Sequence, residues 1–546
     1  MSFKEIKYRY YLPIFFALIL LLGMWAGIRL APEADQHGKM FAPVGERYNK
    51  VSDLMNYILN NYVDSVSRDD LSEDAILGIL ENLDPHSQYF SAELLSEVNE
   101  DLMGNFEGIG IQFRIESDSI TVIQTIDGGP SEKVGLLAGD RIVMVDDSLV
   151  AGVGLKNDGA IAMLKGPRGT EVKIKVYRRG INVLLDFTII RDIIPTYSVD
   201  VAYITNDTIG YIKVSKFSAT TYEEFMAALT KLLDQGMTSL VLDLRGNTGG
   251  YLKAATNMAD EFLETDKLIV YTEGNNRPRT YAYASRSGHF EVQDLVVLIN
   301  EGSASASEIV AGAVQDNDRG VIIGRRSFGK GLVQEQLTLP DGSAVRLTIS
   351  RYYTPSGRCI QRSYENGKED YYDDFYERFH NGEIQNADSI HFIDSLKYTT
   401  AGGRIVYGGG GIMPDIYVPF NADDYPAYYN KLLDGGLIFR FAFDYTDIHR
   451  KELNEYADFA DFNANFNINQ GLFNEFIAFA DEKGISRDPK GIRDSELRIK
   501  TLIKAFIGRN MFDDDGFYPI YHRIDETFLK AIEYLGGDAQ TLKPRL

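Results

Sequence analysis

The sequence predicts a mixed α/β multidomain protein, with helical segments at both ends of the chain. After Arg191, near-continuous apolar strands alternate with helical stretches, which is typical of a buried parallel sheet with crossover helices. Before that point, short alternating strands are separated by glycine turns. The length of 546 residues and the 44% hydrophobic composition supply material for several cores. We therefore expect three or four folded domains.

The N-terminus predicts a membrane anchor over residues 1–31. Residues 11–28 form an apolar run long enough to cross a bilayer, preceded by the positive charges of Lys4, Lys7 and Arg9. A cleavable signal peptide has a similar pattern, but no clear A-x-A site follows and the run is long for such a peptide. We therefore expect an uncleaved signal anchor in the inner (cytoplasmic) membrane, with the rest of the chain on the extracytoplasmic, periplasmic side.

The next two segments differ in their periodicity. Residues 42–103 have apolar residues at helical spacing and predict a small helical domain. Residues 104–190 contain the stretches "GIGIQFRI", "SITVIQTI", "DRIVMVDD" and "TEVKIKVYRRG", which predict a compact module of short strands.

Residues 191–420 predict the α/β domain. The strand "TSLVLDLR" is followed by the helix "AATNMADEFL", and "DLVVLIN" is followed by "ASEIVAGAVQ" and then by "GVIIGRR". Residues 421–546 have helical periodicity and predict a C-terminal helical domain to which we assign no role. "FDDDG" at 512–516 resembles a calcium loop only loosely, and a solvated turn is the preferred interpretation.

Charge and cysteine content exclude several classes of partner. The 79 acidic and 56 basic residues give a net charge of −23, which repels phosphate backbones and argues against nucleic acid. The single Cys359 excludes an internal disulfide framework and a cysteine-based zinc site. We expect no metal and no cofactor.

The stretch "NEGSASASEIVAG" at 300–312 places three serines where a buried strand turns into a helix. Ser305 and Glu308 fit a capping box, in which each side chain satisfies a free amide of the helix start. The same corner suits acyl transfer, because it presents a hydroxyl beside free backbone amides. None of the seven histidines lies in this segment, although a Ser-His-Asp triad assembled in space stays open.

"SFGKGLVQ" at 327–334 offers another base, because Lys330 follows the strand that returns from the serine-bearing helix to the same sheet. A lysine acts as a general base only when it is neutral, and burial near Phe328 favours the neutral form. "GRRSFGKG" also nearly matches a phosphate-binding loop. However, Gly331 lacks the hydroxyl for magnesium, and "LVQEQLTL" alternates like a strand where that loop needs a helix.

Four stretches, "SASASEIVAGAVQD", "SFGKGLVQ", "RYYTPSGRCIQ" and "LDPHSQYF" at 83–90, together resemble the carboxyl-terminal processing, or tail-specific, serine peptidases over roughly residues 45–420. The resemblance implies a crotonase-like α/β peptidase core with Ser305 as nucleophile, Lys330 as general base and Gln334 orienting the lysine. On a straight strand residues 330 and 334 stand about 13 Å apart, so their contact requires a bend at Gly329 or Gly331.

"LDLRGNTGGYLKAA" at 242–255 also runs from a strand through a glycine turn into a helix. In the resembled family such a double glycine lines the oxyanion hole, which implies the amides of Gly250 and Ala306 as donors. Gly246 and Thr248 depart from the more usual Asn and Pro, so the donating glycine stays open.

"GGPSEKVGLLAGDRIVMVDD" at 128–147 makes residues 104–190 resemble a PDZ domain. PDZ domains add a peptide strand to a sheet edge and hold its terminal carboxylate with backbone amides. The implied peptide-binding loop comprises Gly108, Ile109, Gly110 and Ile111, with the isoleucines flooring the pocket.

We therefore expect a membrane-anchored serine endopeptidase that recognises the C-termini of unfolded or tailed proteins and cleaves near them, with oligomer formation left open. The alternative is a membrane-tethered PDZ adaptor that binds C-termini without cutting.

Overall fold

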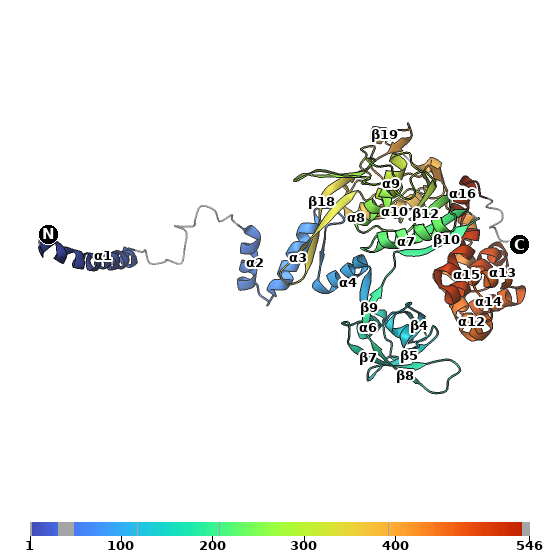
Figure 1. Cartoon of the computed structure of the whole chain (residues 1–546). Helices are drawn as coiled ribbons and strands as arrows, with labels where there is room; N and C mark the ends of the chain where they lie inside the picture. Colours follow the sequence, from blue (N-terminus) through green and yellow to red (C-terminus); the bar gives the residue numbers. More distant parts are fainter. Residues whose placement is uncertain (1–2, 31–48, 117, 207, 391–392, 538–546) are drawn as a thin grey trace. The chain divides into compact units, whose positions relative to one another are not determined.

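The computed structural model describes residues 3–30, 49–116, 118–206, 208–390 and 393–537 (Figure 1). The chain divides into two compact units, Met1–Gly78 and Ile79–Leu546, and each is described by itself.

The first unit is helical. Its elements are α1 (Phe3–Leu30), α2 (Lys50–Asn61) and most of α3 (Arg68–Glu81). Asn49 caps α2, because its side-chain oxygen accepts a hydrogen bond from the amide of Ser52. A helix therefore covers the predicted apolar run, but no helix in the described part of the chain has the length and apolarity that a membrane span requires. The predicted spanning helix is not confirmed.

The module of short strands folds around its own core. Its sheet has the strand order β3-β4-β5-β7-β8, with β6 paired to β5, so β3 lies at an edge. Alternate residues of the strands point inward, among them the fully buried Ile120, Ile142 and Val172. The elements are β2 (Asn105–Gly108), β3 (Ile111–Glu116), β4 (Ser119–Thr125), α5 (Pro130–Lys133), β5 (Arg141–Val145), β6 (Ser148–Leu149), α6 (Asn157–Leu164), β7 (Glu171–Tyr177), β8 (Leu185–Ile190) and β9 (Asp192–Pro195).

A six-stranded sheet organises the α/β domain, in the order β10-β11-β12-β15-β16-β21. All neighbours are parallel except β10 and β11, as the apolar runs and crossover helices predict. The sheet and its helices comprise β10 (Val199–Thr205), β11 (Ile209–Val214), α7 (Thr221–Asp234), β12 (Ser239–Asp243), α8 (Leu252–Asp260), β15 (Asp294–Ile299), α9 (Ala306–Asp316), β16 (Val321–Gly324) and β21 (Ile416–Tyr417).

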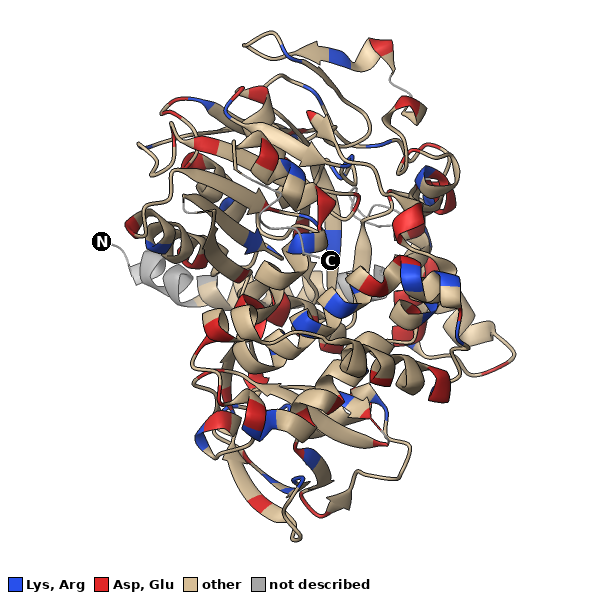
Figure 2. Ribbon diagram, turned by 90° about the vertical axis from the view of Figure 1, so that its right-hand side faces the viewer, with Lys and Arg blue, Asp and Glu red and all other residues tan. Residues whose placement is uncertain are grey.

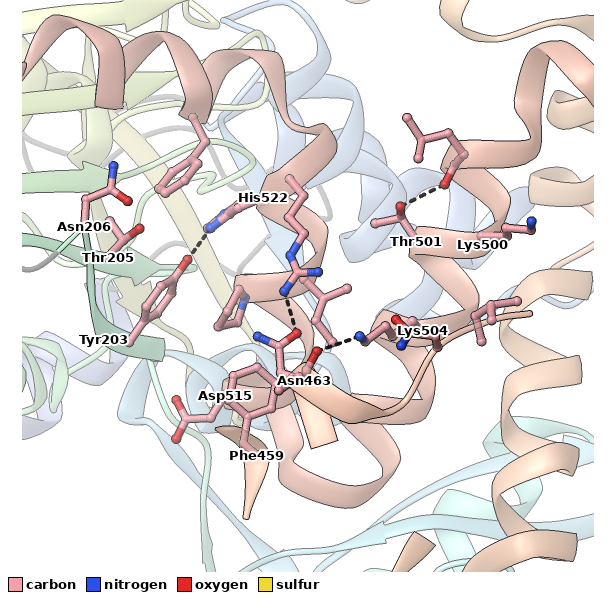
Figure 3. A pocket seen from close by; sticks show the side chains of 18 of the residues that line it. Tyr203, Thr205, Asn206, Phe459, Asn463, Lys500, Thr501, Lys504, Asp515 and His522 are labelled. Carbon is pink, nitrogen blue, oxygen red and sulfur yellow. Dashed lines mark hydrogen bonds between the residues drawn. The ribbon is translucent and has the colours of Figure 1, made fainter. Parts of the chain in front are cut away.

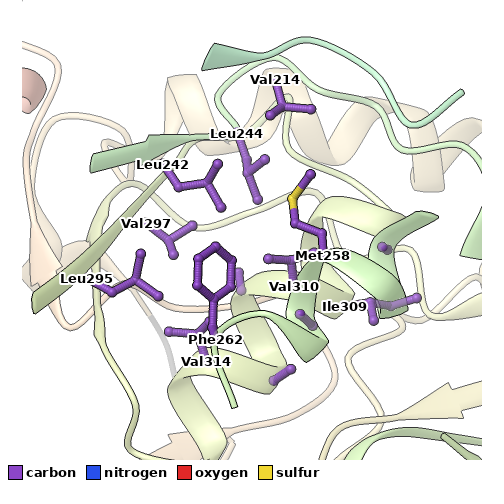
Figure 4. Close-up of a cluster of buried hydrophobic side chains, with 14 of the residues drawn as sticks. Val214, Leu242, Leu244, Met258, Phe262, Leu295, Val297, Ile309, Val310 and Val314 are labelled. Atoms are coloured by element: carbon purple, nitrogen blue, oxygen red, sulfur yellow. The ribbon is translucent and has the colours of Figure 1, made fainter. Parts of the chain in front are cut away.

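Both faces of this sheet are buried. On one face Leu242 and Val297 pack against Met258, Phe262 and Val310 of the helical layer (Figure 4). On the other face the strands pack against the C-terminal helix α16 (Glu526–Tyr534). Because close packing on two faces leaves little freedom, the strand ends that carry the site are held rigidly.

A second, five-stranded sheet has the strand order β1-β18-β13-β14, with β17 also paired to β18. In this sheet β18 pairs both with β1, from the "LDPHSQYF" stretch, and with β17, the strand that follows Lys330. Its elements and neighbours are β1 (Gln88–Phe90), α4 (Ala92–Met103), β13 (Leu268–Gly274), β14 (Arg277–Tyr283), β17 (Leu332–Thr338), β18 (Ala344–Tyr353), α10 (Lys368–His380), η1 (Ala387–Ser389), η2 (Asp394–Leu396), β19 (Lys397–Thr399) and β20 (Ile405–Tyr407).

The C-terminal domain is a helical bundle with an aromatic core. "FDDDG", expected as a solvated turn, instead forms a kink inside α15, where Phe512 and Asp513 leave the helical conformation. Asp513 accepts a hydrogen bond from Gln124 of β4 at 2.5 Å. The elements are η3 (Ala422–Asp424), α11 (Ala427–Asp434), α12 (Leu437–Leu453), α13 (Phe459–Asn465), α14 (Gln470–Glu482), α15 (Pro489–Tyr521), η4 (His522–Ile524) and α16 (Glu526–Tyr534).

Charged contacts join this bundle to the module of short strands. Arg440 pairs with Glu116 at 3.0 Å, and Arg179 pairs with Asp447 at 2.9 Å. Acidic residues are spread over the domains rather than gathered on one of them (Figure 2). Half-exposed pairs of this kind contribute on the order of 1 kcal/mol or less each, so they orient the two domains more than they stabilise them.

Candidate active site

Ser305 stands at the turn between β15 and α9 in a strained conformation. Its φ of 54° and ψ of −110° lie where residues with a side chain rarely occur. A Cβ built on Gly249 would lie 2.7 Å from the Cβ of Ser305, so only glycine allows the two turns to meet here. The glycine turn after β12 therefore packs directly against the serine.

The three serines of the corner have different surroundings. Ser303 donates to the carbonyl of Leu244 at 2.8 Å, and Ser307 donates to the carbonyl of Asn247 at 2.8 Å. Both hydroxyls thus fasten the corner to the glycine turn. The hydroxyl oxygen of Ser305 faces the amide of Glu308 in the predicted capping box, and the hydroxyl donates to no acceptor among the residues that the structure describes.

Glu308 connects the serine corner to the lysine loop. One carboxylate oxygen accepts from the amides of Ser305 (2.8 Å) and Lys330 (2.9 Å). The other accepts from the Gly329 amide (2.7 Å) and the Ser327 hydroxyl (2.5 Å). Burial raises the pKa of Glu308 to about 7, although the four hydrogen bonds act to lower it. All four partners donate, so the geometry is that of an ionised carboxylate.

Tyr352 of β18 provides a second connection between the same two segments. Its buried hydroxyl lies 3.1 Å from the carbonyl oxygen of Ser305 and 2.7 Å from that of Lys330, and it donates to them. Burial raises its pKa well above 10, so the hydroxyl keeps its proton. Glu308 therefore binds the amides of Ser305 and Lys330, and Tyr352 binds their carbonyl oxygens.

Lys330 is partly buried, and its amine donates to Oε1 of Gln334 at 3.1 Å. Burial lowers the pKa of Lys330, and the nearby positive charge of Arg346 lowers it further. The pairing of β17 with β18 shifts register between Val333 and Gln334. Gly329 has a positive φ of 90°, and together with this irregularity it bends the chain. The contact between Lys330 and Gln334 arises at this bend.

The strap of residues 84–90 holds Gln334 from the other side. The side-chain nitrogen of Gln334 donates to the carbonyl of His86, and Asp84 accepts hydrogen bonds from Ser87 (2.5 Å) and Thr348 (3.0 Å). The His86 ring lies 2.8 Å from the hydroxyl of Tyr371, and burial together with the charge of Lys330 lowers its pKa to about 3. A neutral, packed histidine here supports the strap.

The predicted oxyanion donors lie on the two turns that meet at Ser305. Gly250 has a φ of 142° and approaches the carbonyl of Phe217 so closely that a Cβ would stand 2.0 Å from it. The amides of Gly250 and Ala306 form no hydrogen bond with the described residues, whereas the Gly249 amide donates to Asn247 at 2.9 Å. Two donors are thus unused next to the serine.

Two alternative chemistries gain no support from the geometry. The part of the chain that is described contains no hydrogen bond between Ser305 and a histidine, and His289 pairs with Glu261 at 2.7 Å. The segment after Lys330 is the strand β17, where a phosphate-binding loop would need a helix. Among the described residues there is also no group of His, Cys, Asp or Glu that could hold a metal ion.

The predicted peptide-binding loop at residues 108–111 has two isoleucines that pack in the core of its domain and a glycine with a positive φ. Ile109 is 2% exposed, and its carbonyl accepts from the amide (3.1 Å) and hydroxyl (2.6 Å) of Ser131. Gly110 has a φ of 74°, which favours glycine. Gly108 ends β2, and Ile111 begins the edge strand β3 and packs on the same core as Ile109.

Sequence reasoning missed several of these contacts. Glu308 was recognised only as a capping partner of Ser305, although the same S-x-x-E pattern places a carboxylate at the corner. The sequence assigns no individual role to Tyr352 or His86, although both lie in stretches that carry the family resemblance. Their contacts depend on strands distant in sequence, and no local signal identifies them.

Family models match four parts of the chain. "Peptidase family S41" matches residues 208–369 and "PDZ domain" matches residues 108–189. "Activating protease CtpB N-terminal domain" matches residues 24–94, and a "family of unknown function" matches residues 428–513.

Similar proteins are named for carboxy-terminal processing. The carboxy-terminal-processing protease of Bartonella bacilliformis is 38% identical over 317 residues, which cover 57% of this chain and 72% of the relative. CtpB of Bacillus subtilis is 33% identical over 351 residues, covering 62% and 72%. A solved photosystem II D1 C-terminal processing protease is 25% identical, with a TM-score of 0.35 and coverage of 68% and 92%. The chain belongs to the carboxy-terminal processing serine proteases of peptidase family S41 and carries an internal PDZ domain.

Proposed function

We propose that Ser305 and Lys330 are the catalytic dyad of this protease. The observation that carries the proposal is the pair of bridges formed by Glu308 and Tyr352, which fix the main chains of both residues side by side. The serine hydroxyl donates to no described acceptor, and the amine donates to a neutral partner, Gln334. The hydroxyl proton is thus available to a base and the amine has no counter-ion, which supports their assignment as nucleophile and base.

Lys330 serves as base because its surroundings favour the neutral amine. An ordinary lysine, with a pKa of about 10.4, is almost wholly protonated at neutral pH. Burial and the Arg346 charge lower the pKa of Lys330, and Gln334 supplies an oxygen without a compensating negative charge. In this structure the amine bonds to Gln334, so it must turn toward Ser305 when substrate binds. Catalytic hydrogen bonds often tighten only at that stage.

The reaction proceeds through an acyl-enzyme. The amine of Lys330 takes the proton of Ser305, whose oxygen attacks the peptide carbonyl carbon. The resulting oxyanion is stabilised by the unused amides of Gly250 and Ala306. The C–N bond then breaks as Lys330 returns the proton to the departing amine. Water, deprotonated by Lys330, then attacks the ester carbon. The bond between this carbon and the Ser305 oxygen breaks as Lys330 returns the proton to that oxygen, which frees the serine and the new C-terminal carboxyl group.

The PDZ domain delivers the substrate. An extended C-terminus adds to the free edge of β3, and the amides of Gly108, Ile109, Gly110 and Ile111 hold its carboxylate. The protein substrates are unfolded or carry a disordered tail, because a folded chain cannot lie extended along a strand and reach Ser305.

The protease is anchored in the inner membrane by its N-terminal helix, with the catalytic unit on the periplasmic side. Support comes from the apolar run at 11–28 and from Lys4, Lys7 and Arg9 before it. The side chains of Phe15, Leu20 and their neighbours in α1 are more than half exposed, and transfer to lipid would remove them from water.

Ser305→Ala and Lys330→Met are each expected to lower cleavage of an unfolded protein with an apolar C-terminus at least 10³-fold, because each removes one member of the dyad. Cleavage is measured by gel and mass spectrometry, and binding of a C-terminal peptide by fluorescence anisotropy. Peptide affinity should stay within two-fold. Ser287→Ala, at an exposed position of the same domain, is the control and should retain turnover. Wild-type protein that binds the peptide but cuts nothing would identify an adaptor, and full activity in Lys330→Met would indicate another base.

The rate of cleavage is expected to rise with pH as Lys330 loses its proton. Arg346→Gln removes a positive charge that lowers the lysine pKa, so the pKa should rise and the pH–rate profile should move to higher pH by about half a unit to one unit. The measurement is kcat/KM from pH 6 to 10. Arg351→Gln removes a charge from the same strand that is not among the influences on Lys330, and should leave the profile in place. A profile that moves to lower pH in Arg346→Gln would refute a deprotonated lysine base.

Removal of residues 1–31 is expected to release the protein from the membrane. After expression with a signal peptide that directs export, the full chain should sediment with inner-membrane vesicles and resist a salt wash, whereas the shortened chain should be recovered in the periplasmic fraction. Added protease should digest the full chain in spheroplasts only if the catalytic unit faces outward. Extraction of the full chain by salt alone, or its protection in spheroplasts, would contradict the proposed anchor.

A further inference from the structure

A cavity of about 1390 Å³ lies between the sheet of the α/β domain and the C-terminal helical bundle. Its walls come from β10, α7, α13, α15 and the turn into α16 (Figure 3). It is separate from the serine corner, since it is lined neither by Ser305 nor by any residue that contacts it. Nothing in the proposed proteolytic mechanism uses it.

Two cations meet in this cavity without an acidic partner. The amine of Lys504 donates to the main-chain carbonyl of Asn463 at 2.8 Å, and Arg523 donates to the side-chain oxygen of the same residue at 2.5 Å (Figure 3). Neither cation forms an ion pair with a carboxylate in the described part of the chain. Lys500, one turn away on α15, is by contrast paired with Glu496.

This absence is unusual in a chain with a net charge of −23, in which carboxylates outnumber cations. Lys504 is only 7% exposed. Burial and the neighbouring charge of Arg523 lower the pKa of Lys504 to about 8, and burial lowers that of Arg523. Two like charges are therefore held together in a poorly solvated place, at a cost in stability that an anion would offset.

The remaining walls determine what kind of anion fits. Asn463 has a side-chain nitrogen that forms no hydrogen bond with the described residues, so the residue that accepts from both cations also offers a third donor. A phosphate monoester matches two positive charges with its nearly double negative charge and presents three acceptor oxygens. A single carboxylate would leave one cation uncompensated. Phe459, Ile520 and Phe528 add apolar surface elsewhere in the lining of the cavity.

We propose that this cavity binds a small molecule that carries a phosphate group, with its oxygens held by Lys504, Arg523 and Asn463 and its apolar part against the aromatic wall. Asp494 and Asp515 also line the cavity but contact neither cation. They would disfavour a second negative group placed beside them, whereas Lys231 and Arg493, which also line the cavity, would not.

The test is calorimetric titration of the full chain, purified in detergent, with phenyl phosphate, inorganic phosphate and benzoate at constant ionic strength. We expect saturable 1:1 binding of phenyl phosphate, with a Kd at least ten-fold lower than that of inorganic phosphate or benzoate. Lys504→Met and Arg523→Gln should each raise the Kd for phenyl phosphate at least ten-fold. Lys530→Met is the matched control, because this exposed lysine pairs with Glu533 outside the cavity, and it should bind as the wild type does.

Thermal unfolding without ligand separates loss of binding from loss of fold. Lys504→Met should not lower the Tm, because it removes an unpaired buried charge, and phenyl phosphate should raise the Tm of the wild type but not of this variant. Proteolysis should be unchanged in both cavity variants. Absence of saturable binding by phenyl phosphate, unaltered affinity in both variants, or equally tight binding of benzoate would each overturn the proposal.

Discussion

The carboxylate of Glu308 is the interaction on which the site depends. It is buried within the first turn of α9, and it accepts hydrogen bonds from the main chains of Ser305, Gly329 and Lys330. The start of α9 and the loop that carries Lys330, which are separate in sequence, are thereby both bound to one carboxylate. Removal of any donor would leave part of a buried carboxylate without a hydrogen bond, which costs free energy. This cost holds each donor in place. The separation of Ser305 and Lys330, the proposed nucleophile and base, follows from this cluster rather than from their own side chains.

The rigid sheet makes such a strained corner sustainable. Ser305 has a positive φ, and Gly249 and Gly250 approach neighbouring backbone more closely than a side chain allows. Conformations of this kind cost on the order of 1–3 kcal/mol each and persist only where packing leaves no alternative. Asp316, at the other end of α9, forms a fully buried ion pair with Arg358 at 2.7 Å. The helix is therefore fixed at both ends.

Local sequence patterns were sufficient for much of the fold. The apolar runs around residues 239–243 and 294–299 form adjacent parallel strands, and the glycine turns follow them as expected. The family resemblance singled out Ser305 and Lys330, but spacing alone could not place Gln334. Its contact with Lys330 depends on an irregularity in the pairing with β18 and on the strap at His86. The turn predicted at 512–516 coincides with the kink at Phe512 and Asp513, but the local pattern does not predict that α15 continues on both sides of it.

In the proposed mechanism a neutral Lys330 activates Ser305 to form an acyl-enzyme. This intermediate can be trapped by rapid acid quenching during turnover of a peptide ester, followed by mass spectrometry of the digested protein. We expect a substrate acyl group on the peptide that contains Ser305, accumulating in the wild type and absent after replacement of Lys330. An acyl group on another side chain, or undiminished acylation of Ser305 without the lysine, would contradict it.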